Sequence, residues 1–433
     1  MTTDGAVRRE KLLPSPSLAM SNAANPRPLR SLCEGSIPVE IGCTAYTGVR
    51  STALGRPAGG FVTDPVLATV PLTSLSLGTL GSSFQRAGAV RKNPALVGDR
   101  FVDPLGAGWL ASAEGPSPLD HPLEQDETRL STLVRPTAAD GIQRPVGRAP
   151  ALLDAPLPGL LEICVSLRGG WNFLDDCASG APIVPRLLDW AEEALSDAYA
   201  DALEAADRPV AIAYRDTVGA DVGPYFSERD FSALVAPRLT NLFSSIRRRS
   251  GAPILAVVRG AARPLLRSFV DLGVEAVGVD AGARGMTVPE VRRAVGSSVV
   301  IHGAADLVAL GRALEGGDLK GVALLASEFA AAVPVVAAPL GPIASAGALG
   351  AAARGAAFLN VLTGDELSDL RRVGPVRSII DRAAGARPPE FVDVIAEIDP
   401  ACSRTNPRRT IDGGRRPAGS AEDRSPAAAE HQA

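Results

Sequence analysis

Four side chains suited to proton transfer and anion binding follow predicted strands in the second half of the chain: Asp216, Arg259, Asp280 and His302. Carboxylates and an imidazole transfer protons near neutral pH, and a guanidinium binds carboxylates or phosphates through paired hydrogen bonds. We therefore expect Asp216 and His302 to be catalytic. We expect Arg259 and Asp280, with Gly219 in the loop behind Asp216, to bind an anionic or heteroatom-rich substrate.

A structural explanation stands beside each of these assignments. Strand ends are polar in general, and Asp280 begins a glycine-rich loop in which Asp is a common turn residue. His302 is one of only three histidines, and a buried histidine often only satisfies hydrogen bonds in a core. His121 is interpreted as a loop residue and not as a base.

Apolar runs predict the strands that position these side chains. They span 210–215, 254–258, 275–279 and 298–302, and helical patterns separate them. Strands that alternate with helices indicate βαβ crossovers and a parallel sheet. Side chains at the carboxyl ends of such strands face the ligand crevice, so the four groups are expected to share one mouth. The first half is less regular, with strands predicted at 38–42, 101–102 and 160–166.

Helix signals fill the intervals between the second-half strands. A helix that starts near Pro185 carries an apolar stripe, and Ser227 with Asp230 forms an S-x-x-D cap before a helix that Pro237 is expected to kink. A further helix over 263–272 ends at Gly273. The segment 287–290 is predicted to be a capping box. The stripe near Pro185 consists of Leu188, Ala191, Leu195, Tyr199 and Ala202.

Composition restricts the class of protein. The chain has 433 residues, 46% hydrophobic and 21% charged, with a net charge of −4, which is typical of a soluble globular protein without a nucleic-acid partner. Its five cysteines are far apart and form no C-x-x-C pair, so we expect reduced thiols and no zinc knuckle. The polar start shows no signal peptide, and we expect a cytoplasmic protein.

One stretch, 329–353, has no charged residue and is long enough to span a bilayer. It is rich in alanine and contains three prolines, so we interpret it as a buried strand and helix and expect no membrane contact. Composition also predicts a disordered lead-in over 1–30, one folded domain over 31–400 and a disordered tail over 401–433.

Five segments in order resemble the uroporphyrinogen decarboxylase superfamily, and its corrinoid-dependent methyltransferase branch more closely than the decarboxylases. They are IPVEIGCTAYTGV at 37–49, an acid-x-x-Gly-x-x-Trp and His-Pro-Leu segment at 101–123, SLRGGWNFLDD at 166–176, an acid-x-x-Gly loop with Gly-Pro at 215–239, and HGAADL at 302–307. The resemblance implies an α/β fold of the (β/α)8 TIM-barrel type. It also implies a methyltransferase that acts on a small molecule, with a corrinoid carried by a partner protein.

The chain departs from that branch at its metal site. Thiol-methylating members carry a His-x-Cys and a late cysteine that hold zinc. Here Val257 and Arg259 occupy the matching positions, and no cysteine lies between 177 and 402. We therefore expect no metal ligands and no tightly bound cofactor. Two alternatives stay open: a uroporphyrinogen decarboxylase, although 30–60 lacks the arginine-rich loop of those enzymes, and a catalytically inactive ligand-binding barrel.

Overall fold

The computed structural model describes residues 85–89, 100–112, 115–136, 142–143, 151–206, 209, 211–278, 280, 282–330, 334–339, 346–360 and 362. The predicted lead-in, the predicted strand at 38–42, the family-like segment at 37–49 and the predicted tail lie outside these residues. The described part is a mixed α/β fold built on one large sheet.

Eight strands form this sheet, in the order β13-β12-β11-β10-β7-β6-β1-β5. Every neighbouring pair from β1 to β13 is parallel, and β5 pairs antiparallel with β1. In chain order the strands are β1 Gln85–Ala89, β5 Ile142–Gln143, β6 Ala151–Leu153, β7 Ala211–Thr217, β10 Ile254–Arg259, β11 Ala276–Gly278, β12 Val300–Ala305 and β13 Val335–Pro339.

The parallel strands follow one another in space in the same order as in the chain. A doubly wound sheet reverses its strand order at one point, and this sheet does not. Because parallel crossovers are right-handed, an unreversed order puts all connecting helices on one face. A barrel covers the other face by curving the sheet around it, so the winding is TIM-barrel-like. Among the described residues, β13 and β5 are the edge strands.

Alternate residues of the strands fall into two buried clusters. The larger cluster joins strand residues such as Ile212, Tyr214 and Ile254 to the helices. The smaller cluster lies on the opposite face, which we call the inner face. Since successive strand residues point to opposite faces, these clusters fix the direction of every other strand side chain. The inner-face cluster is Leu152, Ala211, Ala213, Leu255, Val257, Ala276 and Val300.

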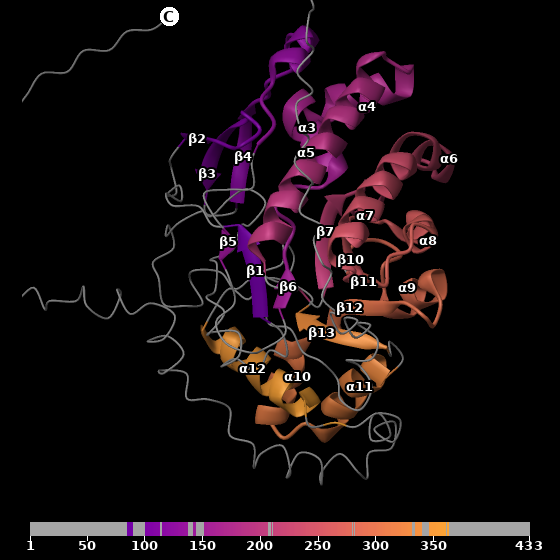
Figure 1. Ribbon diagram of the computed structural model, residues 1–433. Helices are drawn as coiled ribbons and strands as arrows, with labels where there is room; N and C mark the ends of the chain where they lie inside the picture. Colours follow the sequence, from indigo (N-terminus) through magenta and orange to yellow (C-terminus); the bar gives the residue numbers. More distant parts are fainter. Residues whose placement is uncertain are drawn as a thin grey trace, which may run out of the picture. The chain divides into compact units, whose positions relative to one another are not determined.

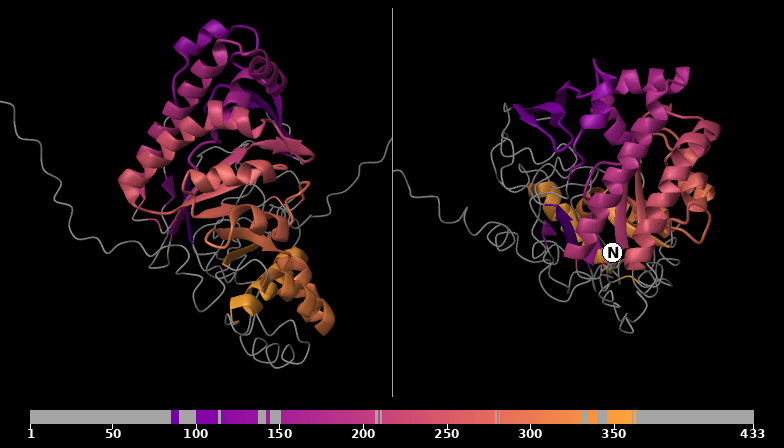
Figure 2. Two further views of the ribbon diagram at one scale, coloured as in Figure 1. Left: turned by 90° about the vertical axis from the view of Figure 1, so that its right-hand side faces the viewer. Right: turned by 45° about the horizontal axis from the view of Figure 1, so that its top comes forward.

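Helices connect the parallel strands and pack on the face opposite the inner face. Figure 1 shows α7, α8 and α9 along one side of the strands β7 to β12, and α10 and α12 pack side by side in Figures 1 and 2. The helices are α3 Leu160–Arg168, α4 Gly170–Ser179, α5 Ile183–Ala205, α6 Glu228–Asp230, α7 Ala236–Ser250, α8 Leu266–Asp271, α9 Val288–Val295, α10 Leu307–Glu315, α11 Leu319–Ala330 and α12 Ala346–Asn360.

The predicted helix near Pro185 is confirmed as α5, and all five residues of its stripe are buried. The predicted helix cap at Ser227 is also confirmed, because Ser227 Oγ accepts the Asp230 N–H at 3.1 Å. Before Pro237 the chain makes a π-helical turn, Phe231–Val235, in which the Ala236 N–H bonds to the Phe231 carbonyl. This wider turn lies directly before Pro237, and the kink expected at Pro237 stays a prediction.

The two shorter predicted helices are present as well. The segment expected over 263–272 is a 3-10 turn, Arg263–Leu265, followed by α8, with Gly273 at φ +79° after its end. The expected capping box precedes α9. There Thr287 Oγ1 donates to the Glu290 carboxylate at 2.6 Å, so the two side chains bond to each other, and the Thr287 side chain makes no cap of the helix backbone.

Two strand predictions of the first half had different outcomes. The strand at 101–102 is confirmed as β2 Arg100–Val102, but it belongs to a separate antiparallel sheet with β3 Gly108–Ser112 and β4 Gly115–Asp120. The strand at 160–166 is wrong, because this segment is helix α3. Its buried residues recur with helical spacing, and backbone N–H groups of its first turn bond to side chains of β7.

The uncharged stretch contributes β13 and α12, as interpreted from its prolines. Within the described residues, no helix has both the length and the apolar character needed to cross a membrane.

Arg292 ties together the amino ends of β12 and β13. Its guanidinium donates to the carbonyls of Gly296 and Val299 at 2.6 and 2.7 Å and to that of Pro334 at 2.9 Å. Burial lowers the pKa of Arg292 below its usual value. The three carbonyls compensate for the desolvation of the charge, so one side chain links the amino ends of these two strands.

Candidate functional site

One row of paired residues crosses the inner face toward the carboxyl ends of the strands. Arg215 pairs with Val257, Val257 with Gly278, and Gly278 with His302. Arg215 and His302 are 3% and 4% exposed. Asp154, directly after β6, is also buried, and its Oδ1 lies 3.7 Å from Arg215 Nε. The row therefore places a buried ion pair and an imidazole next to the apolar inner cluster.

Small side chains occupy the middle of this row. A Cβ at Gly278 would lie 2.9 Å from Val257 Cγ2 and 3.1 Å from Val257 Cα, so a larger residue would displace Val257. Arg215 and His302 are three strands apart, about 14 Å along the sheet at the usual strand spacing. The inner face thus presents cationic and imidazole groups on either side of a narrow apolar strip.

A second polar level lies at the rim of the sheet, where Thr217 of β7 pairs with Arg259 of β10. Arg259 has the same strand direction as the inner-face residues and is exposed. Asp280 accepts the Gly260 N–H at 3.1 Å and so fixes the loop after β10. Arg259 and His302 therefore both lie on the inner face, and Asp280 contacts the loop that follows Arg259. Arg259 ends β10 as predicted, whereas β12 continues to Ala305, so His302 lies within its strand and not at the predicted strand end.

Gly219 holds two rim loops together by close backbone approach. It begins the hairpin of β8 Gly219–Ala220 and β9 Gly223–Pro224. A Cβ at Gly219 would lie 2.6 Å from the Gly223 carbonyl oxygen, and one at Gly260 would overlap the Gly219 carbonyl. The Ala261 N–H also bonds to the Ala220 carbonyl at 2.8 Å. This contact explains glycine at 219 structurally, and its role in substrate binding stays a prediction.

Asp216 points away from the inner face. It lies inside β7 and not after it, on the same side as Tyr214, and is 1% exposed. Its Oδ1 accepts the Glu162 N–H at 3.0 Å, and its Oδ2 accepts the Leu161 N–H at 3.0 Å and the Tyr214 hydroxyl at 2.6 Å. The expectation that Asp216 shares one mouth with Arg259 and His302 is therefore wrong. A catalytic role for Asp216 or His302 stays a prediction.

The environment of Asp216 favours its neutral form. Burial, and then the nearby Glu162 carboxylate, raise the pKa of Asp216 to about 7, against the opposing effect of its hydrogen bonds. A carboxyl group with this pKa changes its protonation near neutral pH, which is also the behaviour of many catalytic acids. Here the hydrogen bonds go to a helix start and to a tyrosine, so the geometry is that of a helix cap.

Glu162 is a rim residue that the sequence interpretation missed. It is half-buried, and its Oε1 accepts a short hydrogen bond from the Thr217 hydroxyl. Burial raises the pKa of nearby Tyr225, Arg259 opposes this, and Glu162, Asp216 and Asp221 add to it. Because 160–166 was predicted to be a strand, Glu162 was not recognised as a site residue. The helical spacing of the apolar residues after Gly159 would have indicated the start of a helix.

The acid-x-x-Gly-x-x-Trp segment forms a closed local structure. Asp103 Oδ1 accepts the N–H groups of Leu105 and Ala107 at 2.8 and 2.9 Å, and its Oδ2 accepts the Trp109 indole N–H at 2.9 Å. The acid and the tryptophan therefore bond to each other across the turn before β3. This arrangement explains their spacing without a ligand.

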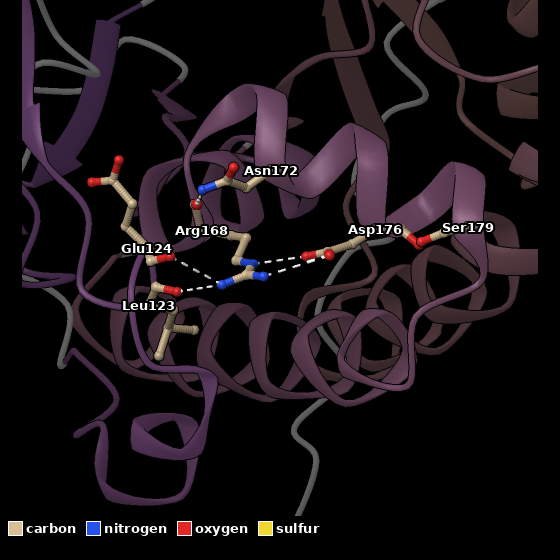
Figure 3. A network of polar contacts seen from close by, with 6 residues as sticks. All are labelled: Leu123, Glu124, Arg168, Asn172, Asp176 and Ser179. Atoms are coloured by element: carbon tan, nitrogen blue, oxygen red, sulfur yellow. Dashed lines mark hydrogen bonds and ion pairs between the residues drawn. The ribbon is translucent and has the colours of Figure 1, made fainter.

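Two further family-like segments are joined by Arg168, as Figure 3 shows. Its Nη1 donates to the Leu123 and Glu124 carbonyls at 2.6 and 3.3 Å, and its Nε donates to Asp176 Oδ2 at 2.7 Å. His121 Nδ1 bonds to the Ser166 carbonyl at 2.8 Å. His-Pro-Leu and the arginine-glycine segment thus form one structural unit that joins the end of β4 to α3 and α4.

The residues present do not fit a zinc ion at the position that the family comparison indicates. Val257 packs against Gly278 and Arg259 bears a cationic group, so neither is a ligand. In the part of the chain that the structure describes, no group of three His, Cys, Asp or Glu residues is placed to hold a metal. Cys164 is buried on α3, and burial raises its pKa well above the usual value.

Comparison with solved structures identifies the fold. A methyltransferase from Methanosarcina mazei is similar to the chain with a TM-score of 0.50 and 19% sequence identity, over 73% of this chain and 93% of that one. At this identity the likeness shows the fold alone, which is that of a TIM-barrel-like α/β protein. No protein-family model and no curated protein matches the chain. A nitroalkane oxidase from Streptomyces ansochromogenes aligns over 55% of the chain with a TM-score of 0.23, from which we draw nothing.

Proposed function

We propose that the protein is a corrinoid-linked methyltransferase of the uroporphyrinogen decarboxylase superfamily that acts without bound zinc. The proposal includes closure of the sheet into a (β/α)8 barrel. The shared fold with a methyltransferase supports it. The observation that carries it is the inner-face set of Arg215, Arg259 and His302 on parallel strands, with Arg259 at the carboxyl end of β10, the end at which barrel enzymes bind their substrates.

This set suits cleavage of a methyl ether or methylamine that carries an anionic group. Arg259 would bind the anion through paired hydrogen bonds. The carbon–oxygen or carbon–nitrogen bond breaks with its electron pair on the leaving atom, which takes a proton from an acid of the protein. The methyl group passes to a reduced corrinoid held by a partner protein. In this proposal the protein is cytoplasmic, with neither nucleic acid nor membrane as a partner.

The test is a transfer assay with purified protein and chemically reduced cobalamin. We expect methylcobalamin, followed by its absorbance, with at least one member of a panel of methoxylated aromatic acids and methylamines that carry a carboxylate. Arg259→Ala should raise KM for that substrate, while Arg186→Ala, an exposed arginine on α5, should leave it unchanged. Absence of methyl transfer across the panel, together with no binding of cobalamin in a titration, would reject the proposal.

A second candidate is a decarboxylase of a tetrapyrrole polycarboxylate. Two guanidinium groups, Arg215 and Arg259, belong to the same strand face and would suit several substrate carboxylates. Incubation with uroporphyrinogen should then release CO2. If neither reaction is found, and a variant with Asp216→Ala and His302→Ala keeps its cellular role, the protein is a barrel that only binds a ligand.

A further inference from the structure

Two side chains of β7 determine where helix α3 begins. The Tyr214 hydroxyl accepts the Leu160 N–H at 3.1 Å, and the Asp216 carboxylate accepts the next two N–H groups, those of Leu161 and Glu162. The N-cap residue, Gly159, makes no side-chain cap. The first turn of α3 is therefore held by the strand, since its otherwise unpaired N–H groups bond to side chains of β7.

Close packing at Gly159 makes this attachment rigid. A Cβ at this position would overlap the Arg215 carbonyl and the Asp216 side chain. The helix start thus lies directly against the strand. Because the backbone of Glu162 is fixed within this turn, the direction in which its side chain leaves the helix is fixed as well.

The Glu162 side chain extends from this turn to the rim of the inner face. There its Oε1 accepts the Thr217 hydroxyl, and Thr217 pairs with Arg259 in the sheet. The charges of Glu162 and Arg259 both act on the half-exposed Tyr225. A carboxylate from the helix layer therefore reaches the same rim as the guanidinium, and it is half-buried, so a ligand can contact it.

We propose that Glu162 is the acid that protonates the leaving atom during methyl transfer, and that Asp216 is a positioning residue that acts through Glu162. The inference rests on the proposed function and names its proton donor. In the step, the methyl–oxygen or methyl–nitrogen bond breaks, its electron pair stays on the leaving atom, and the proton of the Glu162 carboxyl moves to that atom. The methyl group goes to the reduced corrinoid, and Glu162 is left as a carboxylate.

The first experiment compares kcat of Glu162→Gln, Asp216→Asn and the exposed control Glu204→Gln in the transfer assay. Loss of a general acid costs about 10²–10⁴-fold in rate, so we expect a loss of this size in Glu162→Gln and none in Glu204→Gln. Thr217→Val should lower kcat by removing the hydroxyl, and Thr217→Ser should restore it. Thermal unfolding of each variant excludes loss of the fold as the cause.

A pH profile tests whether Glu162 is the acid, and a double variant tests whether Asp216 acts through Glu162. Because Glu162 acts in its protonated form, wild-type kcat should fall as pH rises, and the residual activity of Glu162→Gln should lack this fall. Asp216→Asn should lower kcat in the wild-type background and cause no further loss in the Glu162→Gln background, because Asp216 acts through Glu162. Other charged or titratable groups that the structure describes at the rim include Asp221, Tyr225, Arg259 and Asp280.

The possible outcomes are distinct. If wild-type protein transfers methyl groups but Glu162→Gln keeps the wild-type rate and pH profile, Glu162 is not the acid, although the proposed function stands. If Asp216→Asn lowers kcat by the same factor with and without Glu162→Gln, Asp216 is only structural and the positioning role is rejected. If wild-type protein transfers no methyl group, the inference is rejected together with the function on which it rests.

Discussion

The Tyr214 hydroxyl donates a 2.6 Å hydrogen bond to the carboxylate of Asp216, two residues further along the same face of β7. Together they hold the start of α3 on the helix side of the sheet. The residues between and after them, Arg215 and Thr217, point to the inner face. The end of β7 therefore holds the start of α3 with the side chains on one face and contributes to the candidate site with the side chains on the other face.

The pKa of Asp216 predicts a pH-dependent stability. Its folded value of about 7 lies above the ordinary 3.8, so the folded protein binds this proton more tightly than the unfolded chain. The contribution is fully present below about pH 4 and is lost as pH rises to about 7, by at most roughly 4 kcal/mol. The titratable groups around Asp216 are Glu162 and Cys164 on α3, Tyr214 on β7, Tyr199 on α5 and Tyr225 beyond β9.

Urea unfolding between pH 4 and 8 measures this effect. Since Asp216→Asn has no proton to lose, the stability of wild-type protein relative to this variant should decrease across that window. A constant difference would contradict the raised pKa.

Gly159→Ala should destabilise the protein through steric overlap. Gly159 has φ −66°, which alanine adopts freely, so the cost comes from contact with the Arg215 carbonyl and Asp216. We expect a loss of about 1–3 kcal/mol in the free energy of unfolding. Gly347→Ala on α12 is the matched control, because a Cβ there has no heavy atom within 4 Å. Equal stability of the two variants would show that α3 does not begin against β7 as described.

Arg168→Ala should destabilise the unit that joins β4 to α3 and α4. The substitution leaves Asp176 without its ion pair and the Leu123 carbonyl without its donor, and hydrogen bonds to charged groups contribute about 1.5–3 kcal/mol. Arg168→Lys should recover only part of this loss, because one ammonium group does not reproduce the forked geometry. Chemical unfolding measures the loss of stability in both variants, with Arg186→Ala as an exposed control. Full recovery of the stability by lysine would contradict the prediction.

Arg292→Ala should weaken the amino end of the sheet. It removes the donor of three carbonyls, two before β12 and one before β13. We expect a loss of about 2–4 kcal/mol in the free energy of unfolding. The neighbouring exposed Arg293→Ala should cost much less. Hydrogen exchange should also speed up at the Ile301 N–H, which bonds to Pro334; unchanged exchange there would contradict the prediction.

The sequence predicted where the second-half strands lie but not which way their side chains point. Parallel strands buried on both faces appear as continuous apolar runs, which carry no alternation. The strand at 210–215 extends to Thr217, so Asp216 belongs to the strand and to its helix side. One signal was present: in β7 small Ala211 and Ala213 face inward, and large Ile212 and Tyr214 face the helices.

Contacts between distant segments account for what the sequence did not show. Glu162 reaches the rim because Tyr214 and Asp216, more than fifty residues later, fix the turn that carries it. The ion pair of Arg215 and Asp154 likewise joins separate strands. Such pairs are set by strand register, which a single sequence does not reveal.

The guanidinium of Arg292 fixes the sheet at the end opposite to the candidate site. In TIM-barrel-like folds, residues at the amino ends of the strands contribute to stability and the loops at the carboxyl ends vary. We therefore expect new substrate preferences to be selectable by randomising the exposed positions of the β8–β9 hairpin and of the loop after β10, provided that Gly219 and Gly260 are kept. Because the link at the amino ends lies far from these loops, the chain would be a practical scaffold for directed evolution.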